Sequence, residues 1–311
     1  MKDFNSLLGR LRLRHFDFLD RLGTDANLGR VATEMNMVHS TATKMLQDIE
    51  DTLGLVLFTR NRRGIRATPG GETMIKLARL ILSDLRAGHA ELSIVEKGGV
   101  GLIRIGVFPV VTAELLPALY RQLRQSAPRL DIAIEDGDEL RLTERLSGGD
   151  IDLILGRIDA GRITPDLRHR VLYHEETVVV CGAQNPIADA APEDLPRLMS
   201  EAEWILPTTT TGASRMVSTW IVNAGYSPPR IGVESISALT TAGLLSKTEL
   251  LGIFPLSVGR SFTELGLLRQ LPVSLPKTEF PVGVIYRRAQ EDSSIIRTLI
   301  DHCITATRHL S

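Results

Sequence analysis

Four polar side chains recur along one predicted helix at a spacing that places them on a single face. Ser40, Thr43, Lys44 and Gln47 follow the three- and four-residue steps of an α-helix, and almost no acid shares that face. Serine and threonine hydroxyls can contact phosphates or base edges, glutamine can pair with adenine, and lysine can reach phosphate or guanine. The chemistry that this face predicts is hydrogen bonding to double-stranded DNA.

A run of arginines follows that helix. No Asp or Glu occurs between Thr52 and Gly71, whereas four arginines lie within seven residues, at Arg60, Arg62, Arg63 and Arg66. An isolated run of this kind is most often a solvated basic turn. Beside a helix with a hydrogen-bonding face, however, it favours a patch that contacts phosphates.

Three short helices and a hairpin must position these side chains. Helices are predicted from Leu13 to Leu22, over residues 28–35, and from about 39 to 54. The third buries Ala42, Met45, Leu46 and Ile49, opposite the polar face. Short strands at Leu57–Phe58 and near Ile65 would flank a turn at 61–64. A small packing module is the alternative, but the combination favours a winged helix-turn-helix.

A long amphipathic helix is predicted over residues 71–97. Its apolar residues follow a heptad-like seam of Met74, Ala78, Ile81, Leu85, Leu92 and Val95. A second copy of the chain is the expected partner of this seam, and docking on the chain's own body is the alternative. Two copies would present two reading helices to one duplex. Residues 98–101 read as a hinge.

The last two hundred residues alternate strands and helices, which predicts an α/β fold with largely parallel sheets. Such sheets bind ligands beyond the carboxyl ends of their strands. Helix capping alone would explain each loop there, but their joint placement favours a pocket. The residues that follow successive strands are Pro109, Val110, Val111, Thr112, Gly137, Arg157, Thr208, Thr209, Thr210, Thr211, Ser235, Ile236 and Ser237.

Composition and motif content exclude several other classes of protein. Lys plus Arg total 36 and Asp plus Glu total 37, so a uniformly basic nucleic-acid coat is excluded. No apolar stretch has the length of a membrane span or a signal peptide, so a cytoplasmic protein is expected. Cys181 and Cys303 form no CxxC pair. Cys181 should pack in the interior, and His302 with Cys303 is expected to be a helix surface or a packing site and not a nucleophile pair. No metal, cofactor or catalytic motif is recognised, so an enzyme is not expected.

These segments together resemble LysR-type transcriptional regulators. The resemblance runs from RLRLRHFDFL through LFTRNRRG, RATPGGE and the long helix, and continues in GLIRIGVFPVVTAELLPAL, LSGGDIDLILGR, VESISA and LGIFP. The second half looks most like regulators of galactose-binding-protein operons and of protocatechuate-type aromatic catabolism. The resemblance thus covers nearly the whole chain.

The resemblance implies a fold and a set of boundaries. A winged helix-turn-helix would occupy 1–70, a dimerising linker helix 71–97, a hinge 98–101, and a periplasmic-binding-protein-like α/β effector domain 102–311. Lobe I of that domain would take 102–172 and 288–311, and lobe II 173–287. By position, His39, Ser40, Thr41, Thr43, Lys44 and Gln47 fall on the DNA-reading helix and the arginines on the wing. The loops given above, with Phe254, fall on the inducer cleft.

The partners implied are double-stranded promoter DNA, RNA polymerase, a small inducer, and further copies of the chain in a dimer or tetramer. Hydroxyl-rich loops suit a monosaccharide, while Arg157 and the amides at helix starts favour an organic acid. By analogy alone we expect an activator of a catabolic or transport operon, close to the nucleoid. The alternatives are an enzyme on a binding-protein-like scaffold tethered to DNA, and an effector-independent DNA-bending protein.

Two residues depart from the family pattern at the start of the reading helix. Val38 stands where a capping serine is usual, and valine cannot accept a hydrogen bond. We therefore expect Asn36 or Ser40 to cap the helix instead and to shift its first residue. His39 stands where glutamine is usual, which puts the target bases and its own protonation state in question.

Overall fold

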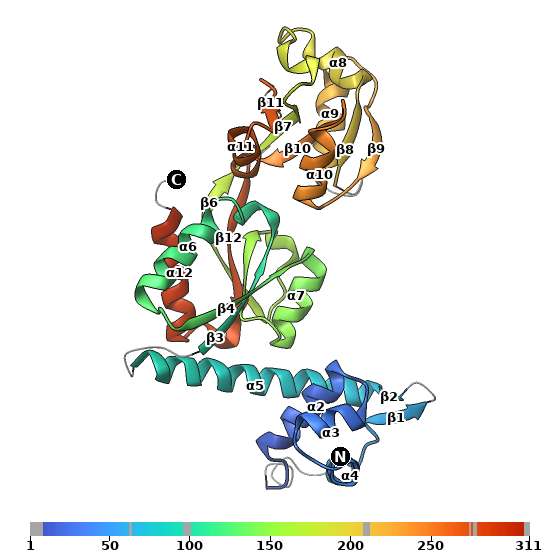
Figure 1. Cartoon of the computed structure of the whole chain (residues 1–311), viewed down its shortest axis with the longest axis vertical. Helices are drawn as coiled ribbons and strands as arrows, with labels where there is room; N and C mark the ends of the chain where they lie inside the picture. The colour runs from blue at the N-terminus through green and yellow to red at the C-terminus, as the bar shows by residue number, and fades with distance from the viewer. Residues whose placement is uncertain are drawn as a thin grey trace.

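The computed structural model of the chain describes residues 9–61, 64–95, 101–207, 212–273, 275 and 279–307. A small helical head with a two-stranded hairpin comes first. A long helix leads from the head to two α/β lobes (Figure 1). Strands cross between the two lobes, and the long helix runs beneath the first of them.

The head packs three helices and a hairpin around one core that includes Phe18, Leu22, Val31 and Ile49. Asn27 caps the second helix by accepting from the amides of Gly29 and Arg30. The elements are α2 (Leu13–Thr24), α3 (Leu28–Glu34), α4 (His39–Leu53), β1 (Phe58–Asn61) and β2 (Gly64–Ala67). The predicted winged helix-turn-helix arrangement is confirmed.

The long helix α5 (Pro69–Val95) begins directly after the hairpin. Ile75 and Ala78 are buried in the core of the head, and α5 packs along α2. The approach is close at Gly23, where an added Cβ would lie 2.5 Å from Cγ2 of Ile75. The first half of α5 is therefore an integral part of the head.

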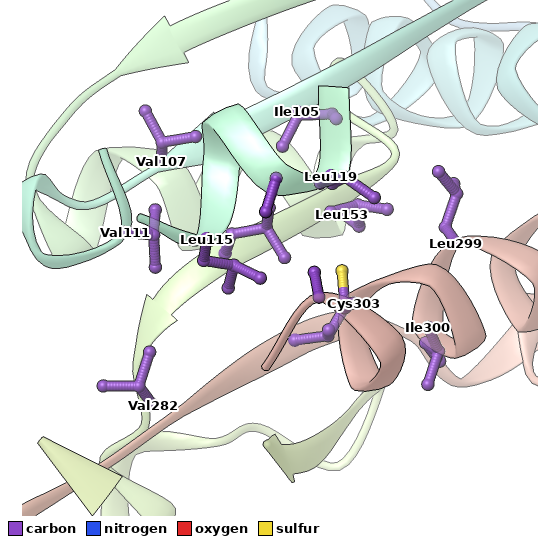
Figure 2. Close-up of a cluster of buried hydrophobic side chains, with 14 of the residues drawn as sticks. Ile105, Val107, Val111, Leu115, Leu119, Leu153, Val282, Leu299, Ile300 and Cys303 are labelled. Atoms are coloured by element: carbon purple, nitrogen blue, oxygen red, sulfur yellow. The ribbon is translucent and has the colours of Figure 1, made fainter. Parts of the chain in front are cut away.

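Lobe I is a five-stranded sheet of order β4-β3-β5-β12-β6 between two helical layers. Helices α6 and α12 cover one face, where Ile105, Leu119, Val282 and Leu299 belong to one hydrophobic core (Figure 2). Helix α7 covers the other face through Leu142 and Leu146. The elements are β3 (Gly101–Val107), α6 (Leu115–Ser126), β4 (Leu130–Asp136), α7 (Glu139–Gly148), β5 (Leu153–Arg157), β6 (Leu167–Glu175), β12 (Phe280–Arg287) and α12 (Ser294–Thr307).

Lobe II is a second five-stranded sheet of order β11-β7-β10-β8-β9. Helices α8 and α9 pack on one face around Trp204, and α10 and α11 pack on the other around Ile205 and Leu245. The elements are β7 (Thr177–Gly182), α8 (Leu195–Glu201), β8 (Glu203–Leu206), α9 (Gly212–Asn223), β9 (Arg230–Glu234), α10 (Ala238–Leu245), β10 (Leu251–Pro255), α11 (Leu256–Glu264) and β11 (Leu268–Gln270).

The expectation of largely parallel sheets is only half right. Each sheet contains two parallel and two antiparallel strand pairs, because the chain crosses between the lobes on antiparallel strands. The lobe boundaries also differ from those expected. Strand β6 runs to Glu175 and β12 covers 280–287, and both belong to the first sheet rather than to lobe II.

Candidate functional site

The reading helix α4 presents its polar face to solvent. Ala42 and Ile49 are fully buried in the head, with Met45 and Leu46 partly buried beside them. On the opposite side, Ser40, Thr41, Lys44, Gln47 and His39 are exposed, and Thr43 is half-buried. The division between apolar and polar faces that the spacing predicts is therefore confirmed.

Helix α4 begins at His39 without a side-chain cap, so the expected cap from Asn36 or Ser40 is wrong. Val38 occupies the N-cap position with extended backbone (φ −77°, ψ 150°), and it is 67% exposed. Asn36 lies two residues before Val38, in the turn between α3 and α4, where its backbone is left-handed (φ 53°). The start is held by backbone alone, because the Thr41 and Ala42 amides donate to the Val38 carbonyl.

The predicted wing is confirmed as an antiparallel hairpin. Arg60 pairs with Ile65 and Thr59 with Arg66 in the register of β1 and β2. Ile65 is buried in the head, whereas the side chain of Arg66 is exposed. Arg62 and Arg63, which were also predicted to contact phosphates, lie outside the described residues.

The apolar seam of α5 differs from the one predicted. Ala78 is fully buried and Met74 packs against the core of the same head, so neither is free for a second copy. Leu77 and Leu85 are instead 43% and 47% exposed, and half-buried Ile81 lies between them at four-residue steps. Part of the predicted seam is thus used within the chain, and a stripe of exposed or half-buried apolar residues remains at Leu77, Ile81 and Leu85. The side chains of Leu92 and Val95, which were also predicted to lie on the seam, are outside those that the structure describes.

Three contacts tie lobe I to helix α11 of lobe II, at the carboxyl end of β10. The Leu256 amide donates to the Glu176 carbonyl at 2.8 Å. The Ser257 hydroxyl donates to the Val110 carbonyl at 3.4 Å, and the Arg260 guanidinium lies 3.7 Å from the Glu114 carboxylate. The sequence does not indicate this tie, because its members lie far apart in the chain and follow no spacing pattern.

A buried carboxylate lies at the same junction. Glu175 is 6% exposed at the end of β6, and burial raises its pKa, an effect that hydrogen bonds from the Glu176 and Ser257 amides partly offset. Burial also raises the pKa of nearby Tyr173 above its ordinary value, with further increments from Glu175 and Glu114. The junction between the lobes therefore holds a buried carboxylate beside a buried tyrosine.

Several residues predicted to line an effector cleft are committed elsewhere. Val110, Val111 and Phe254 are buried in the cores of the lobes, and Phe254 packs on Phe262 with ring centroids 5.5 Å apart. Only their backbone groups are therefore available to a ligand. The Thr112 hydroxyl donates to the Pro109 carbonyl at 2.7 Å, and Glu114 is the N-cap of α6.

The predicted residues of lobe II also form local caps. Ser235 accepts from the Ser237 amide, and Ser237 accepts from the Thr240 amide as the N-cap of α10. Between them Ile236 is 60% exposed. Gly137 lies on the α7 side of lobe I, where an added Cβ would meet Leu142 at 2.9 Å. Thr208, Thr209, Thr210 and Thr211 lie outside the described residues.

Arg157 differs from these residues because none of the described carboxylates forms an ion pair with its guanidinium. It is exposed at the carboxyl end of β5 and lies 4.9 Å from the ring centroid of Phe280. Within the described part of the chain, no carboxylate comes within ion-pair distance of it. An arginine stacked on a ring and lacking a carboxylate partner can bind an anion bidentately.

The two cysteines and His302 are each held within the fold. Cys181 and Cys303 are buried, which raises their thiol pKa to about 11 and about 12. His302 is engaged with the Ser126 hydroxyl at 3.0 Å. The described residues contain no group of three or more His, Cys, Asp or Glu placed to hold a metal ion. None of their helices has the length and apolar character needed to cross a bilayer.

A winged helix-turn-helix, a linker helix and a two-lobed α/β domain define a class: DNA-binding transcription regulators that carry a ligand-binding domain. Two family models match the chain in that arrangement. The bacterial regulatory helix-turn-helix model of the lysR family covers residues 13–72, and the LysR substrate binding domain covers residues 96–308. The chain therefore belongs to the LysR family of transcriptional regulators.

Curated relatives agree with this assignment. The chain is 27% identical over 294 residues to the HTH-type transcriptional regulator GbpR of Azospirillum brasilense, covering 94% of this chain and 86% of that protein. It is 24% identical over 284 residues to PcaQ of Agrobacterium fabrum, covering 91% of each. These relatives are transcriptional regulators and not enzymes, as expected for this chain.

Solved structures share the fold over nearly the whole chain. Full-length CbnR complexed with its target DNA has a TM-score of 0.69 at 18% identity, covering 95% of this chain and all of that one (100%). A full-length OxyR variant from Pseudomonas aeruginosa has a TM-score of 0.68 at 22% identity, covering 94% of each. The order of head, linker helix and two lobes is therefore the arrangement of full-length LysR regulators.

Proposed function

We propose that this LysR regulator reads promoter DNA with the exposed face of α4. Ser40, Thr41, Lys44, Gln47 and His39 would reach base edges and nearby phosphates, with Thr43 at the edge of that face. The wing arginines would contact the adjacent backbone. The observation that carries this proposal is that the polar face is exposed while the opposite stripe is buried.

Two copies of the chain would pair along the stripe of Leu77, Ile81 and Leu85. Leu77 and Leu85 are large exposed apolar side chains on this stripe, and the four-residue steps suit helix-against-helix packing. Such a pair presents two reading helices to a dyad-symmetric site. A tetramer built from two such pairs follows by analogy with the family, as do the boundaries at 70 and 97.

The effector is best explained as an organic acid bound at the junction of the lobes. Arg157 supplies a guanidinium there that stacks on Phe280 and pairs with none of the described carboxylates, whereas the Ser235 and Ser237 oxygens are already acceptors in local caps. The carboxylate of an acid could therefore pair with Arg157, whereas the hydroxyls of a sugar would find fewer free hydrogen-bond acceptors. The relative called PcaQ, named for protocatechuate, agrees with an acid, while GbpR, named for a galactose-binding protein, favours the sugar alternative.

A thermal-shift screen tests the effector class. Monosaccharides, aromatic carboxylic acids and muconate-type diacids are each titrated into the full-length chain and into Arg157→Gln. Binding at 100 times Kd raises the stability of the folded form by about 2.7 kcal/mol, so a true effector gives a clear shift. We expect an acid to raise Tm in the wild type and not in Arg157→Gln. A sugar that raises Tm equally in both proteins contradicts the assignment.

Regulation would follow from the effector state. We propose an activator that works with RNA polymerase at a catabolic or transport promoter, in the cytoplasm where its DNA lies. An effector that shifts the population of lobe arrangements would change how the two heads sit on the DNA. An effector-independent DNA-bending protein is the second candidate, and it predicts no Tm shift with any compound of the screen.

A further inference from the structure

A buried arginine joins lobe I to the linker helix. Arg287 ends β12 and is only 4% exposed. Its Nη1 donates to the carbonyls of Leu146 and Ile151, both at 3.1 Å, so one arm of the guanidinium is fixed to lobe I. Its Nη2 donates to the Ser83 hydroxyl at 2.9 Å and lies 3.6 Å from the Asp84 carboxylate, both on α5.

A second arginine extends this contact into the head. Arg79, one turn before Ser83 on α5, places its Nε 3.0 Å from Asp20 of α2 and 3.3 Å from Asp150 of lobe I. The backbones also approach closely here. Gly149 is left-handed (φ +79°), and an added Cβ would lie 3.2 Å from both the Ser83 Cβ and the Arg79 carbonyl oxygen. We call the contacts of Arg79, Ser83, Asp84 and Arg287 the linker latch.

Strand β12 connects the linker latch to the junction of the lobes. Phe280, at its first residue, supports the Arg157 guanidinium, and Arg287 is its last residue. Both neighbours, β5 and β6, hydrogen-bond to it along its length, so it moves with the sheet. Phe280 and Arg287 are seven residues apart on this strand, which corresponds to roughly 23 Å. A displacement of β12 at the junction of the lobes would therefore be carried over that distance to the linker latch.

We propose that the linker latch couples the arrangement of the effector domain to the position of the DNA-reading head in the same chain. The direction of the signal rests on the proposed function, in which an effector binds beside Phe280. The coupling itself needs no effector. By linkage, if the position of the head depends on the latch, DNA binding must change how often the latch opens.

A single thiol reports on opening of the linker latch. Ser83 is fully buried, and so are both native cysteines, Cys181 and Cys303. In Ser83→Cys the new thiol should therefore react with an Ellman-type reagent only when the latch opens. Arg287 keeps Asp84 and its two carbonyls as partners in this variant.

The full-length Ser83→Cys protein is labelled alone and with a duplex that the wild type has selected from a random-sequence pool. We expect slow labelling of the free protein, and labelling roughly tenfold faster or more when Arg287→Lys removes the forked hydrogen bonds. Asp84→Asn should have a smaller effect in the same direction. Thr73→Ala, which removes an exposed hydroxyl from the same helix, should leave the rate unchanged.

Duplex binding should change the labelling rate by more than threefold in either direction. If the duplex binds but the rate stays within that limit, the coupling is refuted while the DNA-reading assignment stands. Labelling as fast as that of an unfolded chain shows that the latch is open in solution and also refutes it. If no duplex is selected, the DNA-reading assignment fails, and an unchanged rate in Arg287→Lys then refutes the latch independently.

Hydrogen exchange covers the case in which Ser83→Cys does not fold. Asp84 is 58% exposed, so Asp84→Asn is a mild change that keeps the native Ser83. Amides of residues 79–86 should exchange faster in this variant than in Thr73→Ala, and duplex should alter their exchange in the wild type. The proposal is overturned if these amides exchange equally fast in Asp84→Asn and Thr73→Ala, and equally fast in the wild type with and without duplex.

Discussion

The uncapped start of α4 gives a sharp prediction about the stability of the reading helix. Val38 already has N-cap backbone geometry and is 67% exposed, so a substitution there removes little buried surface. Threonine has nearly the shape of valine but adds a hydroxyl oxygen, which can accept from the amides of the first turn. Val38→Thr should therefore stabilise α4 by about 1 kcal/mol.

Native-state hydrogen exchange measures this gain in the full-length protein. Because about 1.4 kcal/mol is a factor of ten, about 1 kcal/mol predicts roughly fivefold slower exchange of α4 amides. Val38→Ala is the matched control, since it shortens the side chain and offers no acceptor. If α4 exchanges no more slowly in Val38→Thr than in Val38→Ala, the first-turn amides are not lacking a cap and the reasoning fails.

Three further predictions concern the wing, the linker helix and the junction of the lobes. Arg66→Ala should weaken binding to every duplex alike and reduce the slope of log K against log salt by about 1 in a gel-shift series; an unchanged slope removes Arg66 from the phosphate contacts. Leu77→Ala with Leu85→Ala should weaken dimer formation by about tenfold or more in sedimentation equilibrium, because each buried leucine contributes about 1.5–3 kcal/mol, whereas an unaltered dimer constant places the interface elsewhere. Burial raises the pKa of Glu175, so ionisation of this carboxylate costs stability at neutral pH, and Glu175→Gln should then be as stable as the wild type or more stable. That advantage should shrink as pH falls toward the ordinary value of 4.5, and urea unfolding that shows the opposite trend contradicts the assignment.

The sequence predicted the head well because local spacing determines it. The stripe of Ala42 and Ile49 against the face of Ser40 and Gln47 is a property of one helix, and the structure preserves it. The capping of that helix was predicted wrongly. A polar side chain near Val38 was expected to cap the helix in place of the usual serine. Asn36 instead lies in a left-handed turn, and no side chain caps the first turn of α4.

The linker helix and the lobes were predicted less completely, because their contacts are long-range. A heptad-like seam does not reveal which of its residues the head already uses, and Ala78 proved to be one of them. Both faces of strand β6 are partly exposed, so no apolar run marks it in the sequence. Arg287 and Ser83 lie 204 residues apart, and nothing in their spacing indicates that they meet.

The candidate effector residues were predicted from loop positions, which identify the edge of a sheet but not the direction of a side chain. Val111 comes after β3 and Phe254 lies near the end of β10, yet both side chains turn into the cores of their lobes. Arg157, the last residue of β5, instead remains exposed beside Phe280. Packing decides between these outcomes, and packing depends on neighbours that are distant in sequence.

The central claim is that the exposed face of α4 reads a duplex, twice in each dimer. The direct measurement is a footprint of full-length wild type, Gln47→Ala and Asp48→Ala on the selected duplex, where Asp48 is an exposed neighbour on the same helix. We predict two protected half-sites one or more helical turns apart. Gln47→Ala should lose about 1–3 kcal/mol of discrimination at one base pair in each half-site, and Asp48→Ala should lose none. A single protected site, or equal discrimination by all three proteins, would contradict the claim.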